Sequence, residues 1–413
     1  MKVLGIIAEY NPFHNGHQYH LQESIRIVSP DYTVCVMSGN FTQRGEPAMA
    51  DKWIRASAAI RNGIDLVIEL PFVFACNNAE YFAKGAIDIL NRLGCVTHLS
   101  FGSEAGELSS LKMTADFLSQ ESEQLKAGIK EFADQGLSFP RSRYEAVKQC
   151  KGRDCADILK SPNNILAVEY LKQLNITNSR IEPFTLKRFG TGYLDKNYSE
   201  RIASALAIRQ LLNKSGDIKE ISDYIPVSTF EALNGLGRGV NLTLNDFYSL
   251  LIYQILISDP SALGNIFSAT EGLEHKVKKA ASSSVNIDTL MHTILSKRYT
   301  KTRIQRLLTH ILIQLDKESF REILDKQINY ARILATNYKG TSLLKQIKKE
   351  DLNSIPILTN INREVANDAD EWKLLKYDIR ASDIYNLIAY KEIYDHSDYV
   401  TKPFLDFDKS KIT

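Results

Sequence analysis

Residues 2–20 read "KVLGIIAEYNPFHNGHQYH" and decide the fold. The apolar run "VLGII" predicts a buried strand, and the apolar residues of "LQESIRIV", which begins at residue 21, recur at helical spacing. The turn between them holds His14, His17 and His20, three of the eight histidines in 413 residues. A strand that gives way to a helix in this manner is the first unit of an alternating α/β fold.

The same rhythm continues through the first half of the chain. Further short, apolar strands are predicted at 32–38, 65–70, 96–102 and 179–186. Helical patterns lie between or after them, at 48–63, 78–94, 161–174 and 199–212. Strands that are apolar on both faces are usually covered by helices on each side. The sequence therefore predicts a Rossmann-like, doubly wound parallel sheet.

The pattern changes near residue 213. Apolar residues now recur every three or four positions, which is the spacing of amphipathic helices. This spacing is found in 244–257, 287–299, 302–315, 319–334 and 380–394. We therefore predict two domains, an α/β domain over 1–212 and an α-helical C-terminal domain over 213–413.

Composition excludes several classes of protein. Hydrophobic residues make up 44% and charged residues 24% of the chain, a mixture typical of globular proteins with a core. No apolar run approaches the length of about 18 residues that a membrane span requires. The five cysteines are scattered without C-x-x-C spacing, which argues against a disulfide framework or a zinc knuckle. We expect a cytoplasmic protein that does not contact a membrane.

The histidine turn lies where an open parallel sheet binds ligands, at the carboxyl end of a strand. The helix that follows offers free N–H groups and a partial positive charge to a phosphate. Gly16 allows the backbone to approach a ligand, and His14 and His17 can face the same side of the first helical turn. Imidazoles there could donate to phosphate oxygens as charge develops. This is the chemistry of nucleotidyl transfer, in which the α-phosphate of ATP is attacked and pyrophosphate leaves.

Two other interpretations of the turn stay open at this point. H-x-G-H could occur by chance, with each histidine making only a local hydrogen bond. A zinc site made of His14, His17 and His20 is the second, although the spacing differs from His-Glu-x-x-His and no cysteine pair lies nearby. The position of the turn in the predicted fold favours a nucleotide.

"NPFHNGH" resembles the H-x-G-H signature of the nucleotidylyltransferase superfamily. Members also carry I-S-S-T-x-x-R at the start of a late helix, where Ser and Arg hold the triphosphate. "IASALAIR" (202–209) matches this motif at Ile202, Ser204 and Arg209, but Ala205 and Leu206 replace the second serine and the threonine. The resemblance implies that His14, His17 and Arg209 are catalytic. The histidines would stabilise charge on the α-phosphate, and Arg209 would steady the pyrophosphate.

Six segments together resemble the bacterial tRNA(Met) cytidine acetate ligase family. They are "GIIAEYNPFHNGHQYHL", "MSGNFTQRGEPA", "DLVIELPFVFA", "LSFGSE", "LKSPNNILAVEYLK" and "LKRFGTGY". The resemblance implies that acetate attacks the α-phosphate of ATP to give acetyl-adenylate. The acetyl group would then pass to N4 of the wobble cytidine of elongator tRNA(Met), giving N4-acetylcytidine.

The resemblance also implies which residues bind ATP. They are Ile7, Ala8, Glu9, Tyr10, Asn11, His14, Gly16, His17, His20, Gly102, Asn163 and Arg188. Gly102 follows a strand, where a side chain would obstruct an adenine or ribose. Mg²⁺ is expected to accompany ATP, held by phosphates and water and not by a set of protein ligands. The polar loop at 38–48 suits substrate positioning, with Gln43, Arg44 and Glu46 as candidates.

Two basic clusters are candidates for RNA contacts. The first, free of acidic residues, consists of Lys297, Arg298, Lys301, Arg303 and Arg306. The second consists of Arg141, Arg143, Lys148, Lys151 and Arg153. Such clusters can neutralise backbone phosphates, and Tyr144 or Tyr299 could stack on a base. The predicted partners are acetate and elongator tRNA(Met), together with a homodimer.

Two rival functions remain at this stage. The chain could be a nucleotidyltransferase for small substrates that does not use RNA. It could also be a non-catalytic, nucleotide-binding RNA-binding module, as the incomplete I-S-S-T motif would allow.

Overall fold

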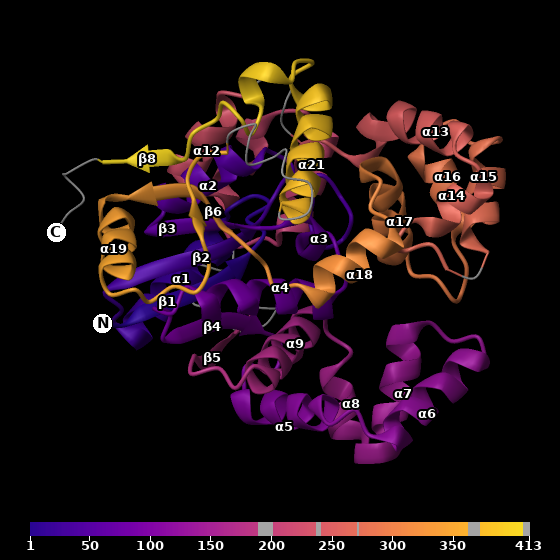
Figure 1. The fold of residues 1–413 in the computed structure, drawn as a ribbon, viewed down its shortest axis with the longest axis horizontal. Coiled ribbons are helices and arrows are strands. Elements are labelled where there is room, and N and C mark those ends of the chain that lie inside the picture. Colours follow the sequence, from indigo (N-terminus) through magenta and orange to yellow (C-terminus); the bar gives the residue numbers. More distant parts are fainter. Residues whose placement is uncertain (189–200, 237–240, 271, 362–371, 408–413) are drawn as a thin grey trace.

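The computed structural model describes residues 1–188, 201–236, 241–270, 272–361 and 372–407 (Figure 1). Five parallel strands form the centre of its sheet: β1 (Val3–Ala8), β2 (Tyr32–Ser38), β3 (Leu66–Leu70), β4 (His98–Ser103) and β5 (Glu182–Lys187). Their order is β5-β4-β1-β2-β3, so the direction of winding reverses between β1 and β4. The predicted strands and the doubly wound topology are confirmed.

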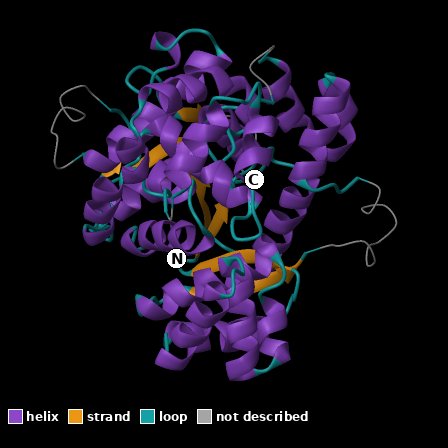
Figure 2. Cartoon of the chain, turned by 90° about the vertical axis from the view of Figure 1, so that its right-hand side faces the viewer, coloured by secondary structure: helices purple, strands orange, loops and turns teal. Residues whose placement is uncertain are grey.

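Helices cover both faces of this sheet (Figure 2). Alternate residues of β2 enter different cores: Val34 and Val36 face one, and Cys35 and Met37 face the other. The helices α1 (Asn15–Val28) and α2 (Lys52–Arg61) pack on the Cys35 side, whereas α4 (Ala79–Arg92) and α9 (Pro162–Ile176) pack on the opposite side. This two-sided burial explains why the strands are apolar throughout.

The remaining helices of the first half extend from the carboxyl edge of the sheet. The short α3 (Phe72–Ala75) follows β3. A group below the sheet in Figure 1 contains α5 (Leu108–Ser119), α6 (Glu123–Asp134), α7 (Phe139–Lys151) and α8 (Arg153–Ile158). The helix predicted over residues 199–212 has different bounds in the structure. Residues 199–200 lie outside the described part, and the helix α11 begins at Ala205 and ends at Ser215, because the Ser204 side chain caps it by accepting from the Ala207 N–H.

Most of the second half is helical, as predicted. A helical region on the right of Figure 1 contains α13 (Tyr248–Ile257), α14 (Pro260–Asn265), α15 (Leu273–Ala281), α16 (Ile287–Ile294) and α17 (Lys301–Ile313), and α18 (Lys317–Asp325) leads from it toward the centre. The helix α12 (Val227–Asn234) lies between α11 and α13 in the chain, and the described 3₁₀ helices are Ile218–Tyr224, Leu244–Phe247 and Tyr394–His396. Among the described helices, none is long and apolar enough to cross a membrane.

The prediction of a wholly helical second half is wrong after residue 330. The strand β6 (Ala331–Asn337) joins the sheet antiparallel to β3, and β7 (Ile357–Leu358) and β8 (Phe404–Asp406) pair with β6. The helices α19 (Tyr338–Lys349) and α21 (Lys373–Ala389) complete this part. Residues 331–334 also fit a helical period, but pairing with the edge of β3 satisfies their backbone and buries them. The division of the chain at residue 212 stays a prediction.

A buried group of charges joins β6 to the rest of the sheet. Lys52 Nζ lies 2.8 Å from both Glu69 Oε1 and Asp398 Oδ2. Arg332 Nη1 lies 2.6 Å from Asp398 Oδ2 and 3.4 Å from Glu69 Oε2. Because all four side chains are at most 3% exposed, each charge depends on its partners for the solvation that water no longer provides.

The first prediction concerns this group. Lys52→Met should lower the free energy of unfolding by about 3–5 kcal/mol, because it leaves two buried carboxylates with one cation. Urea denaturation at pH 7 would measure the change. Lys130→Met, at an exposed position on α6, is the matched control and should stay within about 0.5 kcal/mol of the unaltered protein. An equal effect of both substitutions would contradict the prediction.

Candidate active site

The turn after β1 lies at the point where the winding of the sheet reverses. β1 is flanked by β2 on one side and β4 on the other, and the chain leaves β1 for α1 at this edge. The connections that follow β1 and β4 therefore run to opposite faces of the sheet and leave a crevice between them. Open α/β sheets bind ligands in such a crevice. The structure places the histidine turn at this crevice.

His14 and His17 cap the first helix reciprocally. The N–H of His17 donates to His14 Nδ1 and the N–H of His14 donates to His17 Nδ1, each over 3.3 Å. The two rings stack with centroids 3.7 Å apart. Since both Nδ1 atoms accept hydrogen bonds, each neutral imidazole carries its proton on Nε2. The pair is thus arranged to donate and not to accept.

Burial keeps these histidines neutral. It lowers the pKa of His14 to about 3, with help from the charges of Arg188 and Arg209. It lowers the pKa of His17 well below its ordinary value, and the neighbouring His14 and Arg188 act in the same direction. It also lowers the pKa of His20 to about 4, with Arg188 as the second cause. At neutral pH all three rings are uncharged donors beside a positive environment.

His20, the third histidine of the turn, contacts β4. Its Nε2 lies 3.1 Å from Ser100 Oγ, which in turn lies 2.7 Å from Ser24 Oγ. His14 and His17 are thus paired with each other, whereas His20 contacts the serines of β4 and α1. No cluster of metal-ligating side chains is present among the residues that the structure describes. The arrangement thus favours the nucleotide interpretation over the zinc interpretation.

Arg188 and Arg209 approach the histidines from distant parts of the chain. Arg209 Nη1 donates to the carbonyl of Asn11 over 2.7 Å, and its Nη2 lies 3.6 Å from Glu46 Oε2. Burial lowers the pKa of both arginines, whereas nearby carboxylates raise it: Glu104 for Arg188, and Glu46 and then Glu9 for Arg209. The half-buried Arg209 and the exposed Arg188 beside neutral donors form a site suited to a polyphosphate.

The two glycines of the predicted site make room for side chains. A Cβ at Gly16 would lie 2.9 Å from His14 Cε1, so any larger residue would push the imidazole away. A Cβ at Gly102 would lie 3.0 Å from Arg188 Cγ. Gly102 therefore leaves room for the Arg188 side chain, and its expected role of leaving space for an adenine or ribose stays a prediction.

Glu104 was not identified from the sequence. Its Oε1 accepts from Asn163 Nδ2 over 2.7 Å, and its Oε2 accepts from the N–H of Asn164 over 2.8 Å. Ser161 stands at the N-cap position of α9, but its side chain makes no capping hydrogen bond. The Glu104 carboxylate accepts these N–H groups at the start of α9 instead and holds the Asn163 side chain. The sequence signal that could have identified Glu104 is its position at the end of "SFGSE", directly after a predicted strand.

The loop at 38–48 is also fixed by a residue that the sequence did not single out. Arg55 is 2% exposed and donates to the carbonyls of Glu9 and Ala50, with a further bond to Ser38 over 3.1 Å. The N–H of Gln43 donates to Glu9 Oε1 over 2.8 Å. The loop is therefore attached directly to the residues that lead into the histidine turn.

Helix α17 docks on the same loop. Gly45 has a φ of 75°, and a Cβ there would lie 2.4 Å from the backbone nitrogen of Arg306. Arg306 Nη1 donates to the carbonyl of Gln43 over 3.2 Å, and Gln305 Nε2 donates to Glu46 Oε1 over 2.8 Å. Glu46 thus lies between α17 and Arg209. Of the three loop candidates, Gln43 and Glu46 have these contacts and Arg44 is exposed.

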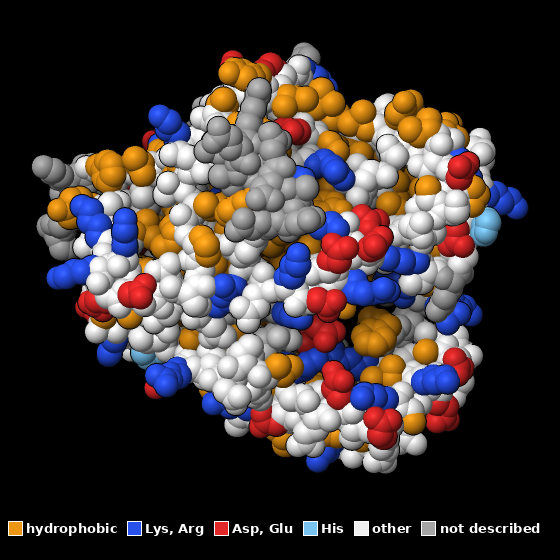
Figure 3. Space-filling view, viewed as in Figure 1, with side chains coloured by type: hydrophobic (Ala, Val, Ile, Leu, Met, Phe, Trp, Pro, Cys, Tyr) orange, Lys and Arg blue, Asp and Glu red, His pale blue; other side chains and the backbone are white. Residues whose placement is uncertain are grey.

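The first basic cluster divides into two groups. Lys297, Arg298 and Lys301 are exposed, whereas Arg303 and Arg306 are half-buried. Tyr299 is 8% exposed and lies under the Arg303 guanidinium, 4.9 Å from it, so the prediction that it could stack on a base is wrong. The face near α17 and α18 is hollowed above α7 and α8, and side chains of both charges line the hollow (Figure 3).

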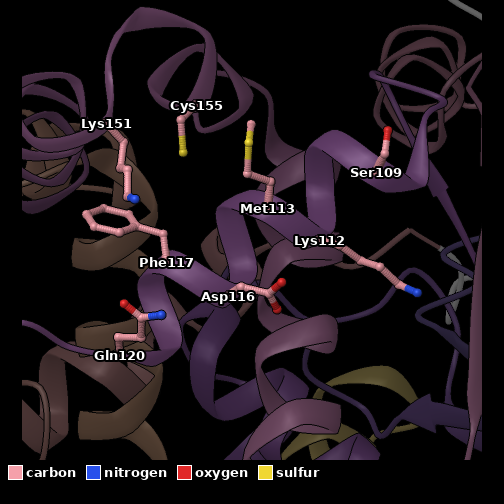
Figure 4. Close-up of a pocket in the computed structure, with 8 residues that line it drawn as sticks. All are labelled: Ser109, Lys112, Met113, Asp116, Phe117, Gln120, Lys151 and Cys155. Atoms are coloured by element: carbon pink, nitrogen blue, oxygen red, sulfur yellow. The ribbon is translucent and has the colours of Figure 1, made fainter.

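The second basic cluster is largely paired with carboxylates. Arg143 lies 2.7 Å from Glu169, and Lys148 lies 3.5 Å from Glu145. The pocket in Figure 4 lies beside this cluster, has a volume of about 440 Å³ and contains none of the predicted nucleotide residues. It is lined by Ser109, Lys112, Met113, Asp116, Phe117, Gln120, Lys151 and Cys155.

The doubly wound sheet and the H-x-G-H turn at its crevice define a nucleotidyltransferase. A family model described as HIGH Nucleotidyl Transferase matches residues 1–398. A tRNA(Met) cytidine acetate ligase of Thermoanaerobacter sp. (strain X514) is 42% identical over 394 residues, 95% of this chain and 96% of that protein. One from Caldicellulosiruptor bescii is 41% identical over 404 residues, 96% of each chain.

A solved structure gives the same result. Thermotoga maritima TmcAL bound with alpha-thio ATP superposes with a TM-score of 0.90 and 33% sequence identity, over 98% of this chain and 100% of that one. The chain therefore belongs to the HIGH nucleotidyl transferase family and, within it, to the tRNA(Met) cytidine acetate ligases.

The second prediction follows from the lowered pKa of His20. An unfolded histidine binds a proton as the pH falls below about 6.5, whereas the buried His20 binds one only near pH 4. Between these two pH values, the unfolded state binds more protons, so a fall in pH favours unfolding. His20→Gln should therefore reduce the loss of unfolding free energy between pH 6 and 4.5, by up to about 1.4 kcal/mol per pH unit. Urea denaturation at several pH values measures this slope.

His310 offers an independent check outside the turn. Burial lowers its pKa to about 4, and its Nε2 lies 2.8 Å from the carbonyl oxygen of Cys76. His310→Gln should reduce the same slope by a similar amount. Slopes identical to that of the unaltered protein in both variants would contradict the assignment of neutral, buried histidines.

Proposed function

We propose that the chain is an ATP-dependent acetate ligase that acetylates the N4 amine of the wobble cytidine in elongator tRNA(Met). The observation that carries the proposal is the reciprocal cap of His14 and His17, with Arg188 and Arg209 beside it at the carboxyl edge of β1. Membership of the ligase family supports the choice of acetate and tRNA as substrates. The reaction would take place in the cytoplasm; a homodimer stays a prediction.

In the first step, an acetate oxygen attacks the α-phosphorus of ATP and the bond to the pyrophosphate oxygen breaks. The Nε2–H groups of His14 and His17 would donate to the α-phosphate oxygens as negative charge develops there, and the N-terminus of α1 would add its partial positive charge. Arg209 and Arg188 would hold the pyrophosphate as it leaves. Neutral imidazoles suit this role, because they polarise the phosphate without giving up a proton.

Mg²⁺ would accompany ATP. The described residues offer no cluster of three or more His, Cys, Asp or Glu for a metal ion, so phosphates and water would supply most of its ligands. When bound, the ion neutralises part of the charge on the phosphates. Its direct protein contacts would be few.

The third prediction tests the first step by acetate-dependent exchange of labelled pyrophosphate into ATP. The unaltered protein should catalyse exchange with acetate, in the absence or presence of elongator tRNA(Met). His17→Ala should reduce the rate by about 10²-fold or more, since a donor to the developing charge is lost. His292→Ala, at an exposed position on α16, is the control. Exchange at the unaltered rate in His17→Ala would contradict the proposed role.

The fourth prediction tests the tRNA side. Replacing Lys297, Arg298 and Lys301 by alanine should weaken tRNA binding and reduce the slope of log affinity against log salt by about 2, since each lost phosphate contact removes about 0.7–0.9. The matched control replaces Lys345, Lys348 and Lys349, three exposed cations of α19 on the opposite side of the molecule (Figure 1). Equal effects of both triple substitutions would point to non-specific attraction and would support the rival without RNA.

A further inference from the structure

The carboxylates at the carboxyl edge of the sheet differ in how fully they are engaged. Glu46 uses Oε1 for Gln305 and Oε2 for Arg209. Glu104 receives three N–H donors at the start of α9. Glu69 is 2% exposed and paired with two buried cations. Both carboxylate oxygens of each of these three residues are therefore already engaged by protein groups, and none is left for a substrate.

Glu9 is different. Its Oε1 accepts from the N–H of Gln43 over 2.8 Å, whereas within the described part of the chain no hydrogen bond or ion pair reaches its second oxygen. The side chain is only half-buried, so a ligand can reach that oxygen. Its backbone carbonyl is fixed by Arg55. The free oxygen is therefore held in a defined place.

Glu9 lies beside the histidine turn and near Arg209. Tyr10, the next residue, packs edge-on against the His17 ring with centroids 5.0 Å apart. Glu9 is near enough to Arg209 to raise the pKa of its guanidinium, and Arg209 itself donates to the carbonyl of Asn11. Glu9 thus lies between the donors to the α-phosphate and the loop at 38–48. A second substrate that approaches the adenylate across this loop would meet Glu9 Oε2.

The histidines are poor proton acceptors in this site. The Nδ1 atoms of His14 and His17 already accept backbone N–H groups. Their Nε2 atoms carry protons, so both rings act as donors. The acyl transfer nevertheless needs an acceptor, because an amine that attacks a carbonyl carbon must lose a proton to become an amide.

We propose that Glu9 is the catalytic base of the second step, an inference that rests on the proposed function. The N4 lone pair of the cytidine forms a bond to the acetyl carbonyl carbon. The bond between that carbon and the oxygen of the AMP phosphate breaks, and AMP leaves with the electron pair. The proton lost by N4 moves to Oε2 of Glu9 and from there to solvent.

Glu9→Gln tests the proposal, because its amide oxygen can still accept from the Gln43 N–H. Two reactions are run in parallel with ATP and acetate, one with elongator tRNA(Met) and one with hydroxylamine. Hydroxylamine captures acetyl-adenylate as acetohydroxamate without the help of a base. Acetylation of tRNA should fall by about 10²-fold or more, the usual contribution of a positioned base, and this loss should exceed that of acetohydroxamate formation by at least about 10-fold. Glu46→Gln, which loosens Arg209, should lower both products together.

Two results would overturn the assignment of Glu9: equal losses of both products, or tRNA acetylation at the unaltered rate. Should Glu9→Gln lose its native circular dichroism, Glu9→Asp takes its place. That variant keeps the charge but withdraws the carboxylate, and it should lower acetylation more than acetohydroxamate formation, with equal losses again overturning the assignment. Absence of acetohydroxamate with the unaltered protein would instead refute the proposed function, whichever role Glu9 has.

Discussion

The buried guanidinium of Arg55 joins the ends of two strands at the site. Its N–H groups donate to carbonyls at the end of β1, at the end of β2 and at the start of α2. Backbone carbonyls at strand ends would otherwise lose their water without gaining a partner, which is costly in a buried setting. A single planar group with five donors satisfies several of them at once. The histidine turn and the loop at 38–48 both start from the carbonyls that Arg55 holds.

A second constraint is the neutrality of the histidines. The reciprocal cap uses both Nδ1 atoms, and burial beside arginines disfavours a second proton on either ring. A protonated imidazole would attract a triphosphate strongly in the ground state, whereas a neutral donor interacts most where charge grows during the reaction. The two arginines supply the positive charge instead. Positive charge and directed donors are thus provided by separate residues in one crevice.

Helix α17 connects the exposed cations to this crevice. Lys301 begins the helix at the surface, Arg303 covers Tyr299, and Gln305 and Arg306 contact the loop at 38–48. Gly45 permits the close approach, since any side chain there would collide with the helix backbone. One helix therefore reaches from a surface that could meet RNA to a loop that contacts Glu9 and Arg209.

The sequence by itself determined the elements whose signals are local. Apolar runs on both faces of each strand, the helical patterns between them and the H-x-G-H turn specified five parallel strands, their covering helices and the place of the ligand crevice. These signals suffice because strand burial and helix capping depend on residues within a few positions of one another.

Only the tertiary structure decided the rest. Residues 331–334 fit a helical period but belong to β6, because the open edge of β3 and the partners of Arg332 are supplied by distant segments. The engagement of Glu104, the burial of Tyr299 and the division of the basic cluster likewise depend on neighbours more than 25 residues away or on the packing of α17. A side chain's partners follow from the three-dimensional contacts of the chain, and no local pattern encodes them.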